Sequence, residues 1–317
     1  MKTQLRFFDL FSGVGGFRKA LEKLGHKCIG FSEIDQNAVR TYQSNFNTRG
    51  EDYIADIAMA SDEEISNLKD FDILCAGFPC QSFSILGNRL GMKDARGTLF
   101  YDIARMLELK QPKFFILENV RGLRNHGNGR TLEAIIKILE NDLGYVTVHD
   151  VLNSSDYGVP QTRRRLFIIG ELNGDRKKMK LCFPPSKIRL RRKMQNILEP
   201  RVENKYFLSE RIKKTVLGTP TKKFIAHNNE TDLPIARPLC ATMHKMHRAH
   251  QDNYVTHRRR LRRLTPRECF VLQGFPRSFA DRAQKKLGVS DTQLYRQAGN
   301  AVTVNVVYNV AKDFLQV

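Results

Sequence analysis

The residue best suited to covalent chemistry in this 317-residue chain is Cys80. Residues 77–84 read Gly-Phe-Pro-Cys-Gln-Ser-Phe-Ser and directly follow the apolar run 71–76. Proline fixes the approach of the chain to the thiol, so we expect Cys80 on a loop at the end of a strand, as a candidate nucleophile. The other cysteines have apolar or mixed neighbours, typical of small packing residues; they are Cys28, Cys75, Cys182, Cys240 and Cys269.

A carboxyl group and an arginine cluster offer acid–base and anion-binding chemistry. Glu118 ends the apolar run 115–117. Apolar surroundings favour the neutral form of a carboxyl group, which can then donate a proton near neutral pH; a salt-bridged or helix-capping glutamate is the alternative. Arg163 and Arg165 precede another apolar run, and alternate side chains on a strand point the same way. These two arginines are therefore predicted to face one site.

A glycine-rich turn follows the first apolar run. The turn, residues 12–16, reads Ser-Gly-Val-Gly-Gly, and glycines there let a ligand approach the backbone. Glu33 comes seventeen residues after Gly16, where a carboxylate suits a ribose diol, and Asp56 is placed to accept from an adenine amino group. Nicotinamide, flavin and S-adenosylmethionine cofactors all fit this pattern, and so does a tight turn without a ligand.

These candidates are embedded in alternating strand-like and helix-like stretches, which predict an α/β fold with a doubly wound, mostly parallel sheet. The predicted strands are 5–11, 27–32, 71–76, 113–118, 145–152 and 166–171. Helical spacing of apolar residues appears in 17–24, 38–46, 132–139 and 303–314, and the last of these is expected to return to the main sheet.

The alternation stops after Gly170. Proline-rich residues 173–260 indicate a smaller, irregular, β-containing second domain inserted into the first. From Arg176 to Arg263 the chain has 24 Lys and Arg against 6 Asp and Glu, a net +18 out of +20 for the whole chain. A charge so concentrated predicts a polyanionic partner, with nucleic acid favoured over membrane because no amphipathic basic helix stands out.

Composition narrows the class of protein further. The chain is 41% hydrophobic, enough for a full core, and no apolar run approaches the length of a membrane span. The first residues lead into a strand pattern rather than a signal peptide. Six cysteines without a CxxC pair argue for reduced thiols. We therefore expect a cytoplasmic protein without disulfides.

Seven ordered segments resemble the motif set of DNA (cytosine-5) methyltransferases, of the compact bacterial HhaI-like type. The resemblance spans residues 8–302 and leaves only the basic segment unmatched. The segments are 9–16 (Asp-Leu-Phe-Ser-Gly-Val-Gly-Gly), 77–84, 96–100 (Arg-Gly-Thr-Leu-Phe), 118–120 (Glu-Asn-Val), 161–165 (Gln-x-Arg-x-Arg), 263–268 (Arg-Leu-Thr-Pro-Arg-Glu) and 297–302 (Gln-x-Gly-Asn-Ala-Val).

The resemblance implies a mechanism. Cytosine C5 is a weak nucleophile until a thiolate adds to C6, and Cys80 matches the family's thiolate. Glu118 matches the residue that hydrogen-bonds or protonates N3. Arg165, supported by Arg163, matches the residue that contacts O2, while Arg164 is expected to point away. No side chain is an obvious base for the C5 proton.

The resemblance also selects S-adenosylmethionine as cofactor. The family's cofactor-binding positions correspond to Phe11, Gly13, Gly15, Glu33, Ile34, Asp56, Ile57, Pro79, Leu99, Asn300 and Val302.

For DNA the resemblance implies that the target base is flipped out of the duplex. Residues 84–94 match the family's mobile catalytic loop; Ser84, Leu86 and Arg96 are the candidate DNA contacts, with Leu86 near the position that fills the gap left by the base. Thr242 is the candidate for orienting the DNA. The catalytic and cofactor-binding domain is expected to comprise 1–175 and about 290–317, and the target-recognition domain about 176–289.

Other readings stay open at this point. A tRNA cytosine-5 methyltransferase would share the same motifs, and an inactive DNA-binding regulator would lack a catalytic group, which this chain retains. His244, His247 and His250 near Cys240 raise the question of zinc, but the basic flanks disfavour a dication, and no metal site is expected. Expected partners are double-stranded DNA and, in the same cell, a cognate restriction endonuclease; a monomer is expected.

Overall fold

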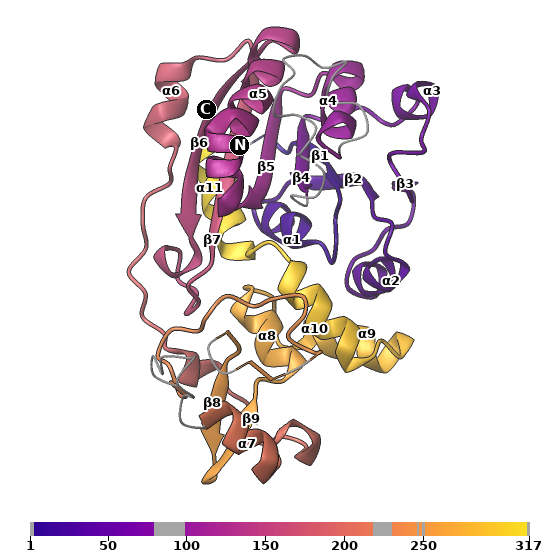
Figure 1. Cartoon of the computed structure of the whole chain (residues 1–317). Coiled ribbons are helices and arrows are strands. Elements are labelled where there is room, and N and C mark those ends of the chain that lie inside the picture. Colours follow the sequence, from indigo (N-terminus) through magenta and orange to yellow (C-terminus); the bar gives the residue numbers. More distant parts are fainter. Residues whose placement is uncertain (1–2, 79–98, 218–229, 246, 249–250, 316–317) are drawn as a thin grey trace.

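The computed structural model describes residues 3–78, 99–217, 230–245, 247–248 and 251–315. A helix-flanked sheet forms one part, and a smaller part with a short hairpin lies beyond the carboxyl ends of most of its strands (Figure 1). The main sheet contains β1 (Arg6–Leu10), β2 (Lys27–Ser32), β3 (Asp52–Ile54), β4 (Ile73–Gly77), β5 (Phe114–Val120), β6 (Tyr145–Asn153) and β7 (Arg164–Leu172).

The strand order in the main sheet is β3-β2-β1-β4-β5-β7-β6. β3, β2, β1, β4 and β5 pair in parallel, whereas β7 is antiparallel to both β5 and β6. All six predicted strands are present, each within two residues of its expected ends. The doubly wound, mostly parallel fold predicted from the alternation is therefore confirmed, and β7 is its antiparallel member.

The helices cover both faces of the sheet because successive strand residues point to opposite sides. On one face, Phe7 and Ile116 belong to a core shared with α1, α2 and α11. On the other, Phe8 and Phe115 pack with α3, α4 and α5. The helices of these layers are α1 (Gly16–Lys23), α2 (Gln36–Asn45), α3 (Asp62–Ser66), α4 (Leu99–Lys110), α5 (Arg130–Lys137) and α11 (Val304–Phe314).

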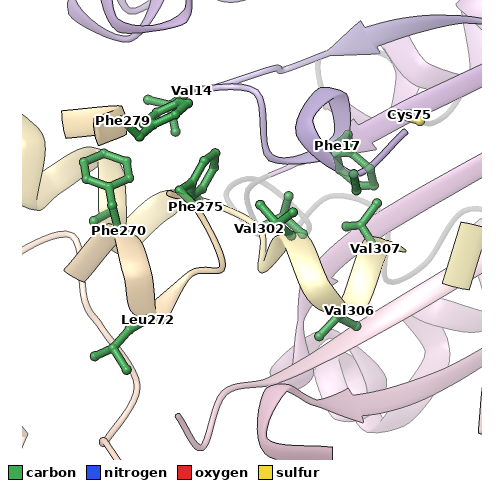
Figure 2. Close-up of a cluster of buried hydrophobic side chains, with 14 of the residues drawn as sticks. Val14, Phe17, Cys75, Phe270, Leu272, Phe275, Phe279, Val302, Val306 and Val307 are labelled. Carbon is green, nitrogen blue, oxygen red and sulfur yellow. The ribbon is translucent and has the colours of Figure 1, made fainter. Parts of the chain in front are cut away.

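Helix α11 returns the end of the chain to the sheet, as predicted. It packs beside α1, and Figure 2 shows Val307 next to Phe17 of that helix. Thr303, the N-cap residue of α11, donates a hydrogen bond to the Gln273 side chain (2.9 Å). The segment just before α11 is thus fixed between the two parts of the molecule.

The smaller part consists of short helices around a two-stranded hairpin. Its described elements are α7 (Glu210–Leu217), β8 (Tyr254–His257), β9 (Arg260–Arg263), α8 (Pro266–Leu272), α9 (Ser278–Leu287) and α10 (Asp291–Asn300), whereas α6 (Arg176–Cys182) packs beside β6 and α11 of the main sheet (Figure 1). Helix α8 begins at a capping box, in which Thr265 and Glu268 each bond the other's backbone N–H. Phe270, Phe275 and Phe279 belong to the same core as Val14 and Val302, so apolar packing joins the two parts (Figure 2).

A buried ion pair fixes the hairpin to α8. The Arg262 guanidinium makes two hydrogen bonds to the Glu268 carboxylate, of 2.8 and 2.7 Å, and neither side chain is exposed to solvent. Bidentate geometry of this kind is the strong form of an arginine–carboxylate contact.

Among the described helices, none has the length and apolar character needed to span a bilayer.

The turn between β8 and β9 has an unusual sequence for its backbone conformation. His257 pairs with Arg260, so the loop has two residues, and these are Arg258 (φ +49°) and Arg259 (φ +64°). Two positive φ angles define a type I′ turn, which favours Asn-Gly. Left-handed backbone costs an ordinary residue about 1–2 kcal/mol.

We therefore expect Arg258→Asn combined with Arg259→Gly to raise the unfolding free energy by about 1 kcal/mol, and Tm by about 2 °C for a chain of this size. Thermal unfolding followed by circular dichroism measures this. Arg258→Gln with Arg259→Gln removes the same charge without favouring positive φ, and its Tm should not rise. Equal Tm gains in both double variants would show that charge, not backbone strain, controls the turn.

Candidate active site

A cleft of about 800 Å³ opens at the carboxyl ends of the parallel strands. This edge is where open α/β sheets bind ligands. Because β7 is antiparallel, its first residues lie at the same edge, and Arg165 pairs in register with Val120. The cleft brings together twelve residues predicted from the sequence: Phe11, Gly13, Glu33, Ile34, Asp56, Ile57, Leu99, Glu118, Arg163, Arg165, Asn300 and Val302.

Glu33 fixes the glycine turn at one end of the cleft. Its Oε2 accepts a hydrogen bond from Gly13 N, and its Oε1 accepts one from Asp35 N, both at 2.8 Å. Burial raises the pKa of Glu33, and these backbone donors offset part of the rise. Gly13 has φ +54°, and a Cβ there would meet no atom within 4 Å. The turn therefore presents open backbone to a ligand.

Close packing requires glycine at both position 15 and position 16. A Cβ on Gly15 would lie 2.4 Å from the Phe46 ring, and one on Gly16 would lie 2.4 Å from Val302 Cγ1. Gly15 also has φ +86°. Gly16 lines the cleft, whereas Gly15, a predicted cofactor residue, does not.

Glu118 and Arg165 form an ion pair deeper in the cleft. Arg165 Nε lies 3.1 Å from Glu118 Oε1, with side-chain exposures of 22% and 11%. Burial raises the pKa of Glu118, while the charges of Arg165 and Arg163 partly counter that rise. A carboxyl group that holds its proton more tightly than usual, beside a cation, can donate a hydrogen bond to a ring nitrogen.

Arg163 is oriented differently from Arg165. Its buried guanidinium donates to Leu239 O (2.9 Å), Gly299 O (2.9 Å) and Ala301 O (3.0 Å). Burial and the neighbouring Arg165 lower the pKa of Arg163 to about 9. Arg163 thus remains cationic at neutral pH and joins β7 to two distant segments.

The strand leading to the candidate nucleophile is fixed by β5. Phe78 N donates to Glu118 O (3.3 Å), and Asn119 Nδ2 donates to Phe78 O (2.9 Å). Asn119 is a functional candidate that sequence reasoning left without a role. The predictions for Pro79, Cys80, Ser84, Leu86 and Arg96 fall outside the described residues.

The segment that carries Thr242 packs against the cleft wall. A Cβ on Gly299 would lie 2.4 Å from Ala241 N, so this contact requires glycine. Thr242 does not line the cleft; its hydroxyl accepts from Arg248 Nη1 (3.2 Å). Nearby, His244 Nδ1 lies 3.0 Å from Ala241 O. Within the described part of the chain, no three His, Cys, Asp or Glu residues are grouped to hold a metal ion.

Arg296 and Phe17 are among the cleft residues that were not predicted from the sequence. Arg296 of α10 lies 3.4 Å from Asp35 Oδ2 and connects the end of the chain to the β2 edge. Phe17 lines the cleft from α1. A charged residue on a helix usually faces solvent, and an aromatic one usually packs in a core. The sequence therefore did not indicate that Arg296 and Phe17 line a cleft, apart from their positions next to motifs.

Comparisons with known proteins agree with this geometry. The fold resembles those of S. pombe Dnmt2 methyltransferase (TM-score 0.74, 19% identity, 99% of each chain) and Entamoeba histolytica methyltransferase EhMeth (TM-score 0.75, 19% identity, 99% of each chain). The chain therefore has the Rossmann-like fold of these methyltransferases. Residues 5–316 match the model of the C-5 cytosine-specific DNA methylases, and the chain belongs to that family.

Relatives in sequence include Type II methyltransferases. The chain is 38% identical to M.DsaV of Dactylococcopsis salina, over 99% of this chain and 87% of that protein. It is 36% identical to M.HhaI of Haemophilus parahaemolyticus, over 98% of this chain and 94% of that protein. The family resemblance noted from the motifs is confirmed.

The pKa of Glu118 leads to a prediction for stability. Since the folded-state pKa is raised, the contribution of Glu118 to folding is fully present below its usual value of 4.5 and is lost as pH rises through the folded pKa. In Glu118→Gln this titration is absent. The Tm of the variant minus that of the wild type should therefore increase from pH 5 to pH 8, measured by calorimetry.

Glu140→Gln provides the control. Burial alone would raise the pKa of Glu140, but hydrogen bonds from Thr147 and Arg176 outweigh it and lower the pKa. Glu140 therefore stays ionised over this pH range, and its replacement should change Tm by an amount independent of pH. A flat Tm difference for Glu118→Gln would mean that Arg165 fully compensates the burial of the carboxylate.

Proposed function

We propose that this protein transfers a methyl group from S-adenosylmethionine to C5 of a flipped-out cytosine in a specific duplex DNA sequence, yielding 5-methylcytosine. The observation that carries the proposal is the Glu118–Arg165 pair, which lies in the same cleft as the Glu33-anchored glycine turn. Family membership and the Type II relatives support a role in bacterial restriction–modification. We place the protein in the cytoplasm as a monomer, with a cognate restriction endonuclease in the same cell.

The charge of the cofactor end of the cleft supports S-adenosylmethionine over a dinucleotide. Three carboxylates, Glu33, Asp35 and Asp56, line this end, and Arg296 is paired with Asp35. Such surroundings disfavour a pyrophosphate and favour a sulfonium and an ammonium. When bound, the cofactor supplies an electrophilic methyl carbon on sulfur.

Several residues fit the remaining parts of such a cofactor. Glu33 offers carboxylate oxygens to a ribose diol, and Gly13 leaves room for close approach. Ile34, 65% exposed, offers apolar surface to a purine ring. Asn300 and Val302 close the cleft from the end of the chain.

In the reaction we propose, the Cys80 thiolate adds to C6 of cytosine, and the electrons released make C5 nucleophilic. Glu118 donates a hydrogen bond or proton at N3, and its raised pKa supports this role. Arg165 holds O2. After methyl transfer C5 loses its proton, and the Cys80 sulfur leaves C6 as thiolate, which restores the ring.

We assign residues 1–175 and about 290–317 to the catalytic and cofactor-binding domain, and about 176–289 to target recognition. The return of α11 to the sheet and the concentration of basic residues in the smaller part support this division. Thr242 lies on a segment that packs on the cleft wall, which supports its role in orienting DNA.

Incubation with methyl-labelled S-adenosylmethionine and separate pools of duplex DNA and tRNA tests the activity. Label should enter the DNA, and bisulfite sequencing should locate it at cytosine C5 within one short sequence. Label in tRNA but not in duplex DNA would reject the proposal in favour of an RNA methyltransferase. Label at a nitrogen atom would reject the mechanism.

Cys80→Ser should abolish methyl transfer while duplex binding is retained, because a hydroxyl at neutral pH is far less nucleophilic than a thiolate. A mechanism-based trap, duplex DNA with 5-fluorocytosine at the target, should form a covalent complex with the wild type only. Turnover by Cys80→Ser would disprove the role of Cys80. Cys240→Ser is the matched control and should remain active.

A further inference from the structure

A second hollow adjoins the catalytic cleft at the end of β5 and the start of β7. It has a volume of about 780 Å³, and we call it the flanking groove. The charged residues that line it are Arg121, Arg124, Asp150, Asp156, Arg164 and Lys187. Val120 lines the cleft and Arg121 the groove, while Arg165 lines the cleft and Arg164 the groove. The two hollows therefore meet at two points of the backbone.

The arginine triplet 163–165, at the start of β7 (Arg164–Leu172), lines both hollows. Because strand side chains alternate, Arg164 points to the opposite side from Arg163 and Arg165. Arg163 and Arg165 are used inside the cleft, by backbone carbonyls and by Glu118. The carbonyl of Arg164 accepts a hydrogen bond from Arg165 Nη1 (3.0 Å), but its exposed side chain makes no ion pair with the described residues. The motif thus supplies one cation that the catalytic site does not use.

The groove carries an excess of positive charge. Arg124 lies 3.8 Å from Asp150, and Lys187 lies 3.1 Å from Asp156, so both acids are paired. Arg121 and Arg164, both exposed, have no carboxylate within 4.0 Å among the residues that the structure describes. The groove therefore presents two unneutralised guanidinium groups to solvent.

The lining indicates the kind of ligand. It contains no aromatic ring and a single apolar residue, Val151, among the described residues. Stacked bases require aromatic platforms, and an apolar peptide would require apolar walls, so neither fits. Guanidinium groups with flanking amides from Asn125 and Asn153 match phosphate oxygens.

We propose that the flanking groove binds the phosphate backbone of the substrate duplex on one side of the target cytosine. This inference rests on the proposed function, because a duplex that places its base beside Arg165 must run past the edge shared with Arg164. Contacts to phosphate position the duplex without reading its sequence. The groove would thus add affinity from the catalytic part, separately from the basic recognition segment.

Binding of the full chain to a fluorescent random-sequence duplex of about 30 base pairs, followed by anisotropy at several salt concentrations, tests the groove. In Arg121→Ala with Arg164→Ala, Kd should rise by about 10- to 100-fold near 0.1 M salt, and the slope of log Kd against log salt should fall by about 2. Lys285→Ala with Lys286→Ala, on exposed positions of α9, removes equal charge and should leave both quantities nearly unchanged.

The placement on one side of the cytosine is tested with the site found by bisulfite sequencing. Duplexes shortened on either flank should differ: the groove variant should lose its binding defect on one of them only. The proposal would be overturned by a binding defect of the groove variant that is equal on both shortened duplexes. It would also be overturned if the groove variant, with the Tm of the wild type, kept the wild-type salt slope, or if it bound only tRNA more weakly. The random-sequence assay reads binding without methyl transfer, so failure of the groove and failure of the proposed activity remain distinguishable.

Discussion

The architecture of the cleft depends on one buried guanidinium. Arg163, at the edge of β7, donates to carbonyls of residues 239, 299 and 301, which are 76 to 138 positions away in sequence. Residues 239 and 301 lie outside helices and strands, and residue 299 is in the last turn of α10, so these carbonyls need other donors once buried. A buried charge is costly unless its donors are satisfied, so the cation and the carbonyls depend on each other. Arg163 thus connects the segment around Leu239 and the end of α10 to the start of β7.

The same cleft separates two electrostatic environments. One end carries Glu33, Asp35 and Asp56, whereas Arg163 and Arg165 surround Glu118 at the other end. Opposite fields within one cleft favour a cationic group at one end and an electron-rich ring at the other. The direction of β7 makes this possible. Because β7 runs antiparallel to β5, its first residues, including Arg165, lie at the edge that otherwise consists of the carboxyl ends of parallel strands. The topology of one strand thus determines where charge can act.

Sequence patterns predicted the sheet well because buried strands leave continuous apolar runs, as at residues 71–76 and 113–118. They did not predict the direction of β7, since alternation reports which face is buried but not which way a strand runs. Glu118 and Glu33 were identifiable because a carboxyl group at the end of a buried strand is uncommon and indicates a functional role. The carbonyl partners of Arg163 were not, since they come from segments brought together only by tertiary packing. β3 (Asp52–Ile54) was too short for its own signal, although Asp56, two residues after its end, was singled out as a candidate adenine contact.

The basic segment shows how far charge counts alone can be interpreted. Two of its arginines are paired with acids. Arg262 is completely buried in an ion pair with Glu268, which joins the hairpin to α8, and Arg248 is paired with Asp252. These ion pairs neutralise charge locally. The net charge of residues 176–263 remains +18, because pairing does not change the charge of any residue. At physiological salt the Debye length is about 8 Å, so this charge attracts DNA only at close range. Attraction of that kind is the same for every sequence. Under the proposed function, discrimination between DNA sequences must therefore come from a few side chains that touch base edges, on a framework fixed by buried contacts such as Arg262–Glu268.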